Sequence, residues 1–264
     1  MKESIKKVKY IRFLYRAGIF LVLTFLFFLS STFIYFFTVD KRKRLHKLIK
    51  NSNFYRDLAL KLFNIKVYIN NFNLNPEESY IITPNHLSYL DILILKNSDK
   101  NLFVSTYEVK NTFLFGKIAE YGGSVFIDRQ SKNGIKREIE MLKEVLEKGF
   151  NLVIFLEGTT SNGETVLPFK SSFVELAFQI GVKIAPTCIK YKAVNREKLN
   201  EKNRDLIYYY GDMKLFNHVF NFLLNVKSVE VEVVFLKPIN PKDFKDRKEL
   251  SKYLHSEILR CYTN

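Results

Sequence analysis

Two hydrophobic patterns divide the chain. Residues 17–39 form an apolar stretch of 23 positions without a charged side chain. From about residue 51 onward, short apolar runs alternate with segments in which apolar residues recur every three or four positions. The first pattern is typical of a membrane helix, and the second of strands that alternate with amphipathic helices.

The alternating part predicts a single α/β domain over residues 51–264. The predicted strands are 66–68, 80–83, 102–105, 124–127, 152–156, 184–191, 207–210 and 229–235. The predicted helices are 135–146, with Ser131 as its cap, 173–180 and 244–262. Such alternation predicts one layered domain with a mostly parallel or mixed sheet flanked by helices. Pro186 inside a predicted strand indicates an edge strand or a bulge.

Residues 1–50 are predicted to be a membrane anchor with basic flanks. As a helix, residues 17–39 would be roughly 35 Å long, against a hydrocarbon core of roughly 30 Å. Six Lys or Arg residues precede the stretch and six follow it, so a single span leaves one basic cluster outside. A re-entrant helical hairpin, broken near residues 30–32, keeps both clusters inside and is the favoured arrangement. A single membrane helix is the alternative.

Composition supports a lipid-associated globular protein. Hydrophobic residues make up 47% of the chain and charged residues 26%, which is enough for a buried core. Two cysteines give no disulfide framework. The net charge of +15 is concentrated around the apolar stretch rather than on a recognition helix, and the sequence has no zinc-finger or RNP-like motif. We therefore expect membrane lipids, and no nucleic acid, as partners.

The first candidate for chemistry is the segment after the strand predicted at 80–83. Pro84 disfavours a helical Thr83, so His86 is expected in a turn and Asp91 in the first turns of a helix. In that arrangement a carboxylate fixes the imidazole tautomer and leaves the second ring nitrogen free to take a proton. A surface histidine and a helix-start aspartate are the plain alternative.

Two further loops carry polar chemistry. Arg129 follows the strand predicted at 124–127 and could hold a phosphate bidentately, or form a surface pair with Asp128. After the strand predicted at 152–156, Glu157 and Gly158 open a run of hydroxyl and amide residues suited to polyol or phosphate oxygens, or to a polar turn. Lys170 adds a cation downstream.

Together these segments resemble the glycerolipid acyltransferase family, which includes the 1-acylglycerol-3-phosphate acyltransferases. The family has four ordered blocks: a histidine and an aspartate separated by four residues, a Gly-to-Arg strand, a Phe-x-Glu-Gly-Thr segment, and a strand with a proline. The matching positions are His86 and Asp91, residues 123–129, then Phe155, Glu157, Gly158, Thr159 and Ser161, and finally Pro186. The resemblance covers about residues 80–191.

The resemblance implies transfer of a fatty acyl group from acyl-CoA or acyl-carrier protein to the free hydroxyl of a lysolipid, with no cofactor and no metal. It implies that His86 is the general base and that Asp91 orients it. It also implies a set of substrate-binding residues, namely Asn85, Ser88, Arg129, Glu157, Gly158, Thr159 and Lys170.

The acceptor implied first is 1-acylglycerol-3-phosphate, which gives phosphatidic acid in phospholipid biosynthesis. Thr160 stands where many members have an arginine, so another lysophospholipid or a lyso-aminolipid is the alternative acceptor. A membrane lipid-binding protein without turnover is the non-enzymatic alternative. The implied location is the cytoplasmic (inner) membrane, with the catalytic domain facing the cytoplasm.

Overall fold

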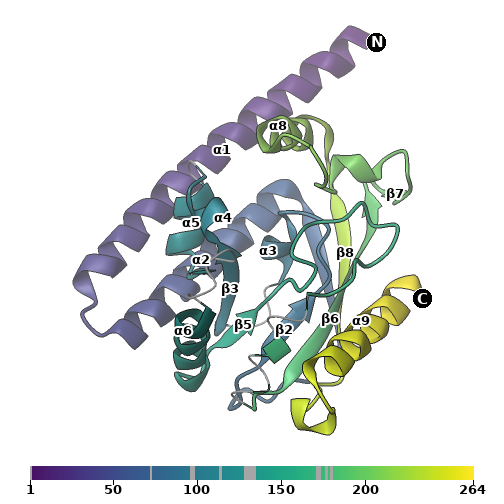
Figure 1. Ribbon diagram of the computed structural model, residues 1–264. Helices are drawn as coiled ribbons and strands as arrows, with labels where there is room; N and C mark the ends of the chain where they lie inside the picture. The colour runs from purple at the N-terminus through teal and green to yellow at the C-terminus, as the bar shows by residue number, and fades with distance from the viewer. Residues whose placement is uncertain are drawn as a thin grey trace.

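A twisted mixed sheet lies at the centre of the computed structural model, which describes residues 2–71, 73–95, 99–112, 115–127, 135–170, 174–175, 178 and 181–264 (Figure 1). Its strand order is β1–β8–β6–β2–β5–β3–β4, and the short β7 pairs with β6. Strands β6, β2, β5, β3 and β4 are parallel, whereas β8 is antiparallel to β6 and parallel to β1. The predicted fold class, a layered α/β domain with a mixed sheet, is confirmed.

Most predicted strands, and the helices predicted at 135–146 and 244–262, lie close to observed elements, whereas α2, α4, α5, α8 and the short β7 were not predicted. The strands are β1 (Ile65–Asn70), β2 (Ile81–Pro84), β3 (Asn101–Thr106), β4 (Val125–Ile127), β5 (Asn151–Val153), β6 (Ile184–Val194), β7 (Glu197–Lys198) and β8 (Val229–Phe235). The helices are α1 (Lys2–Phe37), α2 (Lys41–Phe63), α3 (Asp91–Ile94), α4 (Tyr107–Lys110), α5 (Phe115–Tyr121), α6 (Ile135–Glu147), α8 (Leu215–Asn225) and α9 (Arg247–Thr263), with 3₁₀ turns at Arg204–Leu206 and Pro241–Asp243.

Apolar side chains on the two faces of the sheet build two hydrophobic clusters. Ile82 of β2 belongs to the cluster that α2, α3 and α8 cover, and its neighbour Ile81 belongs to the cluster that α6 and α9 cover. This assignment follows from the two-residue period of a strand. Strand β2 is buried along its whole length because both of its faces are covered.

Two predicted strands differ from the structure. Residues 207–210 do not form a strand, because the N–H groups of Ile207 and Tyr208 donate to the carbonyl of Arg204 and close a turn. The strand predicted at 152–156 ends at Val153, since the chain turns where the Gly158 N–H donates to the Phe155 carbonyl at 3.1 Å. The predicted cap Ser131 and most of the helix predicted at 173–180 lie outside the described residues.

Pro186 does not mark an edge strand, which corrects one of its two interpretations. Strand β6 lies between β8 and β2, inside the sheet. The Pro186 carbonyl accepts the Leu236 N–H at 2.9 Å, and Leu236 comes just after the end of β8, so the missing proline N–H falls where the ladder stops. Ile184 pairs with Ile239, one residue out of the register that joins Thr187 to Phe235. An irregularity of the bulge type therefore accompanies the proline.

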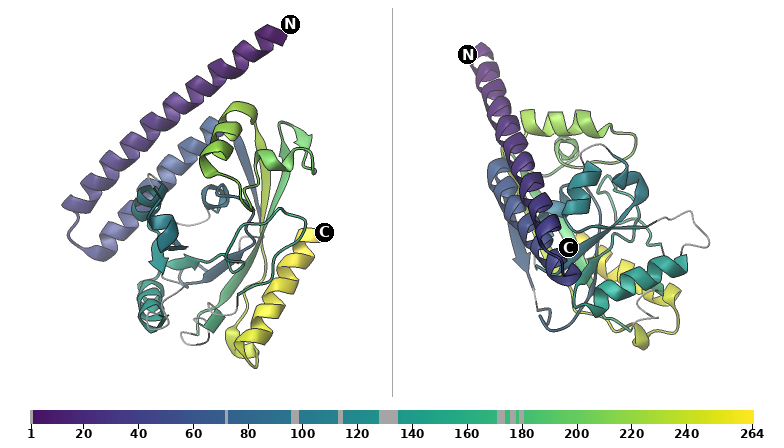
Figure 2. Two further views of the ribbon diagram at one scale, coloured as in Figure 1. Left: turned by 45° about the horizontal axis from the view of Figure 1, so that its top comes forward. Right: turned by 90° about the vertical axis from the view of Figure 1, so that its left-hand side faces the viewer.

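Helix α1 is continuous through residues 30–32, so the predicted re-entrant break at these positions is wrong. The chain instead turns at residues 38–40, where the side chain of Asp40 caps α2 by accepting the Lys43 N–H. Helices α1 and α2 then run side by side in opposite directions (Figures 1 and 2). The boundary predicted between residues 50 and 51 lies inside α2.

In the described part of the chain, one helix segment, Lys7–Phe37, is long and apolar enough to cross a membrane. Only 17% of its most apolar window is buried against the rest of the molecule, unlike the core helix of a water-soluble domain. Side chains of α1 are nevertheless part of the fold: the guanidinium of Arg16 donates to the backbone carbonyl of Lys227 at 3.0 Å. This largely exposed apolar helix indicates that the chain associates with a membrane through α1.

Candidate functional site

The candidate site lies where β2 ends and the chain turns into α3. Strands β5 and β6 flank β2 and run parallel to it, so the carboxyl ends of β2 and β5 meet at one edge of the sheet, where open α/β sheets bind ligands. Strand β6 continues beyond this edge and forms one wall behind the turn. Residues 85–90 make the turn, and Asp91 is the first residue of α3.

The structure brings together the two residues predicted to be catalytic. Nδ1 of His86 lies 2.8 Å from Oδ2 of Asp91. Because a carboxylate accepts hydrogen bonds, Nδ1 carries the ring proton, and Nε2 holds the lone pair that can accept a proton. The plain alternative, a surface histidine beside an unrelated aspartate, does not fit this geometry. Asp91 is fully buried, whereas the His86 side chain is 18% exposed.

The Asp91 carboxylate is held in place by the turn itself. Its Oδ2 also accepts the backbone N–H groups of Leu87 at 2.7 Å and Ser88 at 2.9 Å. Its Oδ1 accepts the hydroxyl of Tyr191 at 2.8 Å. Four hydrogen-bond donors thus compensate the burial of the Asp91 charge, and both carboxylate oxygens accept hydrogen bonds. Burial and the neighbouring carboxylate raise the pKa of Tyr191, which keeps its hydroxyl a donor.

The imidazole of His86 is also fixed by an aromatic side chain. The Phe155 ring stacks on it, with the ring centroids 3.8 Å apart and the planes inclined by 19°. Phe155 lies two residues after the end of β5, in the block that resembles the Phe-x-Glu-Gly-Thr segment. Asp91 and Phe155 together restrict the rotation of the ring, so the direction of Nε2 is set before any substrate binds.

Glu157 stabilises the turn that carries His86. Its Oε1 accepts the His86 N–H at 2.6 Å, and its Oε2 accepts the Leu167 N–H at 2.8 Å. The side chain is 2% exposed. Burial raises the pKa of Glu157 to about 7, although the two backbone donors act in the opposite direction. Both oxygens are thus engaged with backbone, which favours a positioning role for Glu157 over direct contact with an acceptor.

The remaining predicted binding residues fall into three groups. Asn85 and Ser88 are buried, and the Asn85 amide joins the turn to β6 by accepting the Ile189 N–H at 2.7 Å and donating to the Ile189 carbonyl at 3.1 Å. Thr159 and Lys170 are exposed and Gly158 is half-buried, so these three can face a substrate. Arg129 lies outside the described residues.

Tyr191 was missed by the sequence reasoning. It lies 100 positions after Asp91, in a strand whose pattern indicates only that it is buried. A tyrosine among aliphatic strand residues was the available signal, since a buried hydroxyl needs a partner.

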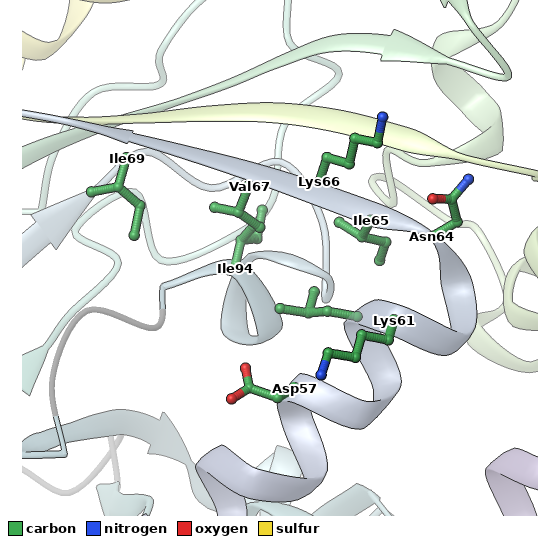
Figure 3. Close-up of a pocket in the computed structure, with 9 residues that line it drawn as sticks. Asp57, Lys61, Asn64, Ile65, Lys66, Val67, Ile69 and Ile94 are labelled. Carbon is green, nitrogen blue, oxygen red and sulfur yellow. The ribbon is translucent and has the colours of Figure 1, made fainter.

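A groove of about 580 Å³ lies elsewhere, between α2 and the edge strand β1 (Figure 3). Figure 3 shows Val67 and Ile94 forming its apolar part, with Asp57 and Lys61 projecting from α2. His86 and Asp91 do not line it. The position of the catalytic pair rests on hydrogen-bond geometry, and this groove is a separate feature.

Comparison with known proteins agrees with this geometry. The acyltransferase family model matches residues 64–190, which include β2, the His86 turn and most of β6. A lyso-ornithine lipid O-acyltransferase from Pseudomonas aeruginosa is 34% identical over 184 residues, 69% of this chain and 67% of the relative. The chain belongs to the acyltransferase family. The family resemblance predicted from the four sequence blocks is confirmed.

Other acyltransferases are similar over most of their length. A probable 1-acyl-sn-glycerol-3-phosphate acyltransferase from Mycoplasma genitalium is 29% identical over 227 residues, 82% of this acyltransferase and 78% of the relative. Among solved structures, the 1-acyl-sn-glycerophosphate (LPA) acyltransferase PlsC from Thermotoga maritima matches with a TM-score of 0.69 and 21% identity, covering 100% of this chain and 97% of that one. At that identity the match supports the fold.

Proposed function

We propose that this acyltransferase transfers a fatty acyl group from an acyl thioester, acyl-CoA or acyl-carrier protein, to the free hydroxyl of a lysolipid, and that His86 is its general base. The observation that carries the proposal is the 2.8 Å contact between Nδ1 of His86 and Oδ2 of Asp91, with Nε2 directed away from the carboxylate. The membrane-associated helix α1 fits a lipid acceptor.

The His86–Asp91 pair can carry out both proton transfers of this reaction. Nε2 of His86 takes the proton of the acceptor hydroxyl as its oxygen attacks the thioester carbonyl carbon. The buried charge of Asp91 stabilises the imidazolium that forms. When the tetrahedral intermediate collapses, the C–S bond breaks and the imidazolium returns its proton to the leaving thiolate. The products are a diacyl lipid and a free thiol. Donor and acceptor react directly, so a covalent acyl-enzyme is unnecessary.

For the acceptor we propose 1-acylglycerol-3-phosphate, with Lys170 as a cation for its phosphate. Lys170 is exposed, and its backbone N–H donates to the Leu156 carbonyl at 2.9 Å, which places it beside the Glu157 turn. Lyso-ornithine lipid is the second candidate. The 34% identical relative acylates it by name, and Thr160 occupies a position where an arginine would favour a phosphate.

For the location we propose the cytoplasmic leaflet of the inner membrane, with α1 lying along the membrane surface. Both halves of α1 contact the domain: Arg12 donates to the Leu224 carbonyl at 3.0 Å, and the Phe28 ring contacts the Tyr121 ring of α5, with the centroids 5.8 Å apart. A helix held at two separated points does not extend across the bilayer away from its domain. Both basic clusters then stay on one side, as the positive-inside rule favours.

One experiment tests the function and the acceptor. Purified protein is incubated with acyl-CoA or acyl-carrier protein and each lysolipid, and the products are identified by mass. We expect phosphatidic acid from 1-acylglycerol-3-phosphate, and about a tenfold higher KM for that acceptor in Lys170→Gln, with Lys252→Gln on α9 as the unaffected control. If diacyl ornithine lipid is the sole product, the acceptor is lyso-ornithine lipid and not 1-acylglycerol-3-phosphate. The absence of product with every donor and acceptor would refute the function.

A further inference from the structure

Helix α8 exposes an apolar face that the fold does not cover. Its inner face packs into the domain through His218 and Phe222, which are buried. On the other side, the side chains of Phe216 and Phe220 are 81% and 43% exposed. They are four residues apart, so they lie one above the other on the same face of the helix.

This face lies beside α1. The Phe220 ring contacts the Phe13 ring of α1, with the centroids 4.8 Å apart. The Arg12 and Arg16 guanidinium groups of α1 donate to the carbonyls of Leu224, Val226 and Lys227 at the end of α8. Figures 1 and 2 show α8 beside the N-terminal half of α1.

The outer side of α1 is itself apolar along its length. Its exposed large apolar residues include Val8, Ile11, Leu14, Tyr15, Leu21, Val22, Phe25, Leu29, Phe33, Phe36 and Phe37. Contiguous apolar surface of this extent marks an interaction site. Because α1 is the membrane-associated helix, the adjoining face of α8 borders the same lipid phase.

The charges around α8 agree with a bilayer surface. Lys214 precedes the helix and Lys227 follows it, and both are exposed. The acidic residue Asp212 lies two positions before Lys214 in the sequence. Phenylalanines between two lysines are typical of a helix that lies in the membrane interface, with its basic residues at anionic headgroups.

We propose that α8 docks onto the lipid bilayer beside α1 through Phe216 and Phe220, as a second membrane contact made by the catalytic domain itself. The occupant of this face is a phospholipid bilayer, because the face adjoins the membrane-associated helix α1 and exposed lysines flank it on both sides. This docking does not depend on which reaction the protein catalyses.

The docking also has a consequence for the site, which rests on the proposed function. His218 Nδ1 lies 3.0 Å from the Tyr89 hydroxyl, and the Tyr209 N–H donates to the Leu87 carbonyl at 3.0 Å. Tyr89 and Leu87 belong to the turn that carries His86. Helix α8 is therefore tied to this turn, and its contact with lipid holds the turn at the surface where a lysolipid resides.

A tryptophan reporter tests the docking directly, because the chain contains no Trp. The full-length Phe216→Trp variant is reconstituted in phosphatidylcholine–phosphatidylglycerol vesicles, with and without phospholipid brominated near the headgroup. We expect a blue-shifted emission and strong quenching by the brominated lipid. The matched control is Tyr253→Trp on α9, where the native tyrosine is 42% exposed and on the opposite side of the sheet. Its emission should stay red-shifted and unquenched. Equal quenching in the two variants, or none in Phe216→Trp, would overturn the proposal.

A charge substitution tests the consequence. Phe216→Asp places a carboxylate in the first turn of α8, where the helix dipole favours it, so the fold is retained. We expect about tenfold slower acyl transfer to a lysolipid carried in vesicles, and an unchanged rate with a short-chain, water-soluble lysolipid. The control Asn217→Asp adds the same charge at the next position and should keep both rates. An unchanged rate on vesicles in Phe216→Asp would overturn the link between docking and activity. A wild-type protein without any acyl transfer would refute the proposed function and leave the quenching result to decide the docking.

Discussion

Replacing Asp91 by asparagine separates the two tasks of this side chain. The position of Oδ2 faces three donors, namely Nδ1–H of His86 and the N–H groups of Leu87 and Ser88, at 2.7–2.9 Å. An amide nitrogen there would meet donors only, so the amide oxygen of Asp91→Asn must take this place. The nitrogen then replaces Oδ1 and donates to the hydroxyl oxygen of Tyr191. The variant keeps His86 in its position and tautomer and loses the negative charge.

The expected loss follows from that charge. Two unit charges about 4 Å apart interact by about 4 kcal/mol at an effective dielectric constant of about 20. This is an upper limit, because the imidazolium is only partly formed in the transition state and the amide oxygen keeps a partial charge. Since about 1.4 kcal/mol corresponds to a tenfold rate change, kcat should fall by about 10²–10³. The fold of the turn should be unaffected.

The assay follows release of the free thiol from acyl-CoA with a chromogenic thiol reagent, at varied lysolipid concentration. We expect a lower kcat, an unchanged KM for the lysolipid and a melting temperature close to that of the wild type. The companion variant His86→Ala removes the base and should lose about 10²–10⁴ in rate. A near wild-type kcat in Asp91→Asn would show that the charge does not assist catalysis. A lower melting temperature together with the lower kcat would show that the amide fails to hold the turn.

Three further predictions concern the groups around this pair. Glu157 binds its proton more tightly in the folded state, because its pKa is raised there to about 7. The free energy of unfolding, measured by chemical denaturation, should therefore fall by about 3 kcal/mol as the pH rises from about 4.5 to 7. The variant Glu157→Gln should not show this pH dependence. Tyr191→Phe removes one donor from the buried Asp91 carboxylate and should lower the free energy of unfolding by about 1.5–3 kcal/mol, with retained activity in the folded fraction. Arg16→Ala removes two bonds to the backbone after α8 and should increase hydrogen exchange of the last turn of α8, whereas Lys9→Ala should not.

Most of the sheet was predictable because the hydrophobic residues of its strands follow a clear pattern, whereas the helices α2, α4, α5 and α8 were not predicted. The alternation Val229, Val231, Val233 and Phe235 predicts β8 to the residue, since these four side chains all face the core. Residues 207–210 have the same strand-favouring composition, yet they form no strand, because Ile207 and Tyr208 donate to the Arg204 carbonyl and Tyr209 donates to the Leu87 carbonyl. Tertiary contacts of this kind are invisible to local patterns.

The candidate site was partly predictable. Pro84 and the spacing from His86 to Asp91 indicate a turn that closes on its own helix, a local feature that the sequence encodes directly. The role of Glu157 depends on where the chain returns at Leu167, and that of Tyr191 depends on the pairing of β6 with β2. The apolar run 17–39 predicted the membrane segment but not the full extent of α1, which begins at Lys2 and is unbroken. The course of α1 along the domain depends on contacts with the end of α8, more than 200 positions away.

The dependence of the turn on β6 bears on how the enzyme is made. Asn85 is bonded to Ile189 and Asp91 to Tyr191, so the segment from β2 to α3 relies on residues synthesised about a hundred positions later. A nascent chain that has emerged only as far as β5 already contains His86 and Asp91 but lacks the strand that fixes them. The reactive geometry therefore requires β6 to have left the ribosome, and its formation includes the entropic cost of closing a loop of about a hundred residues.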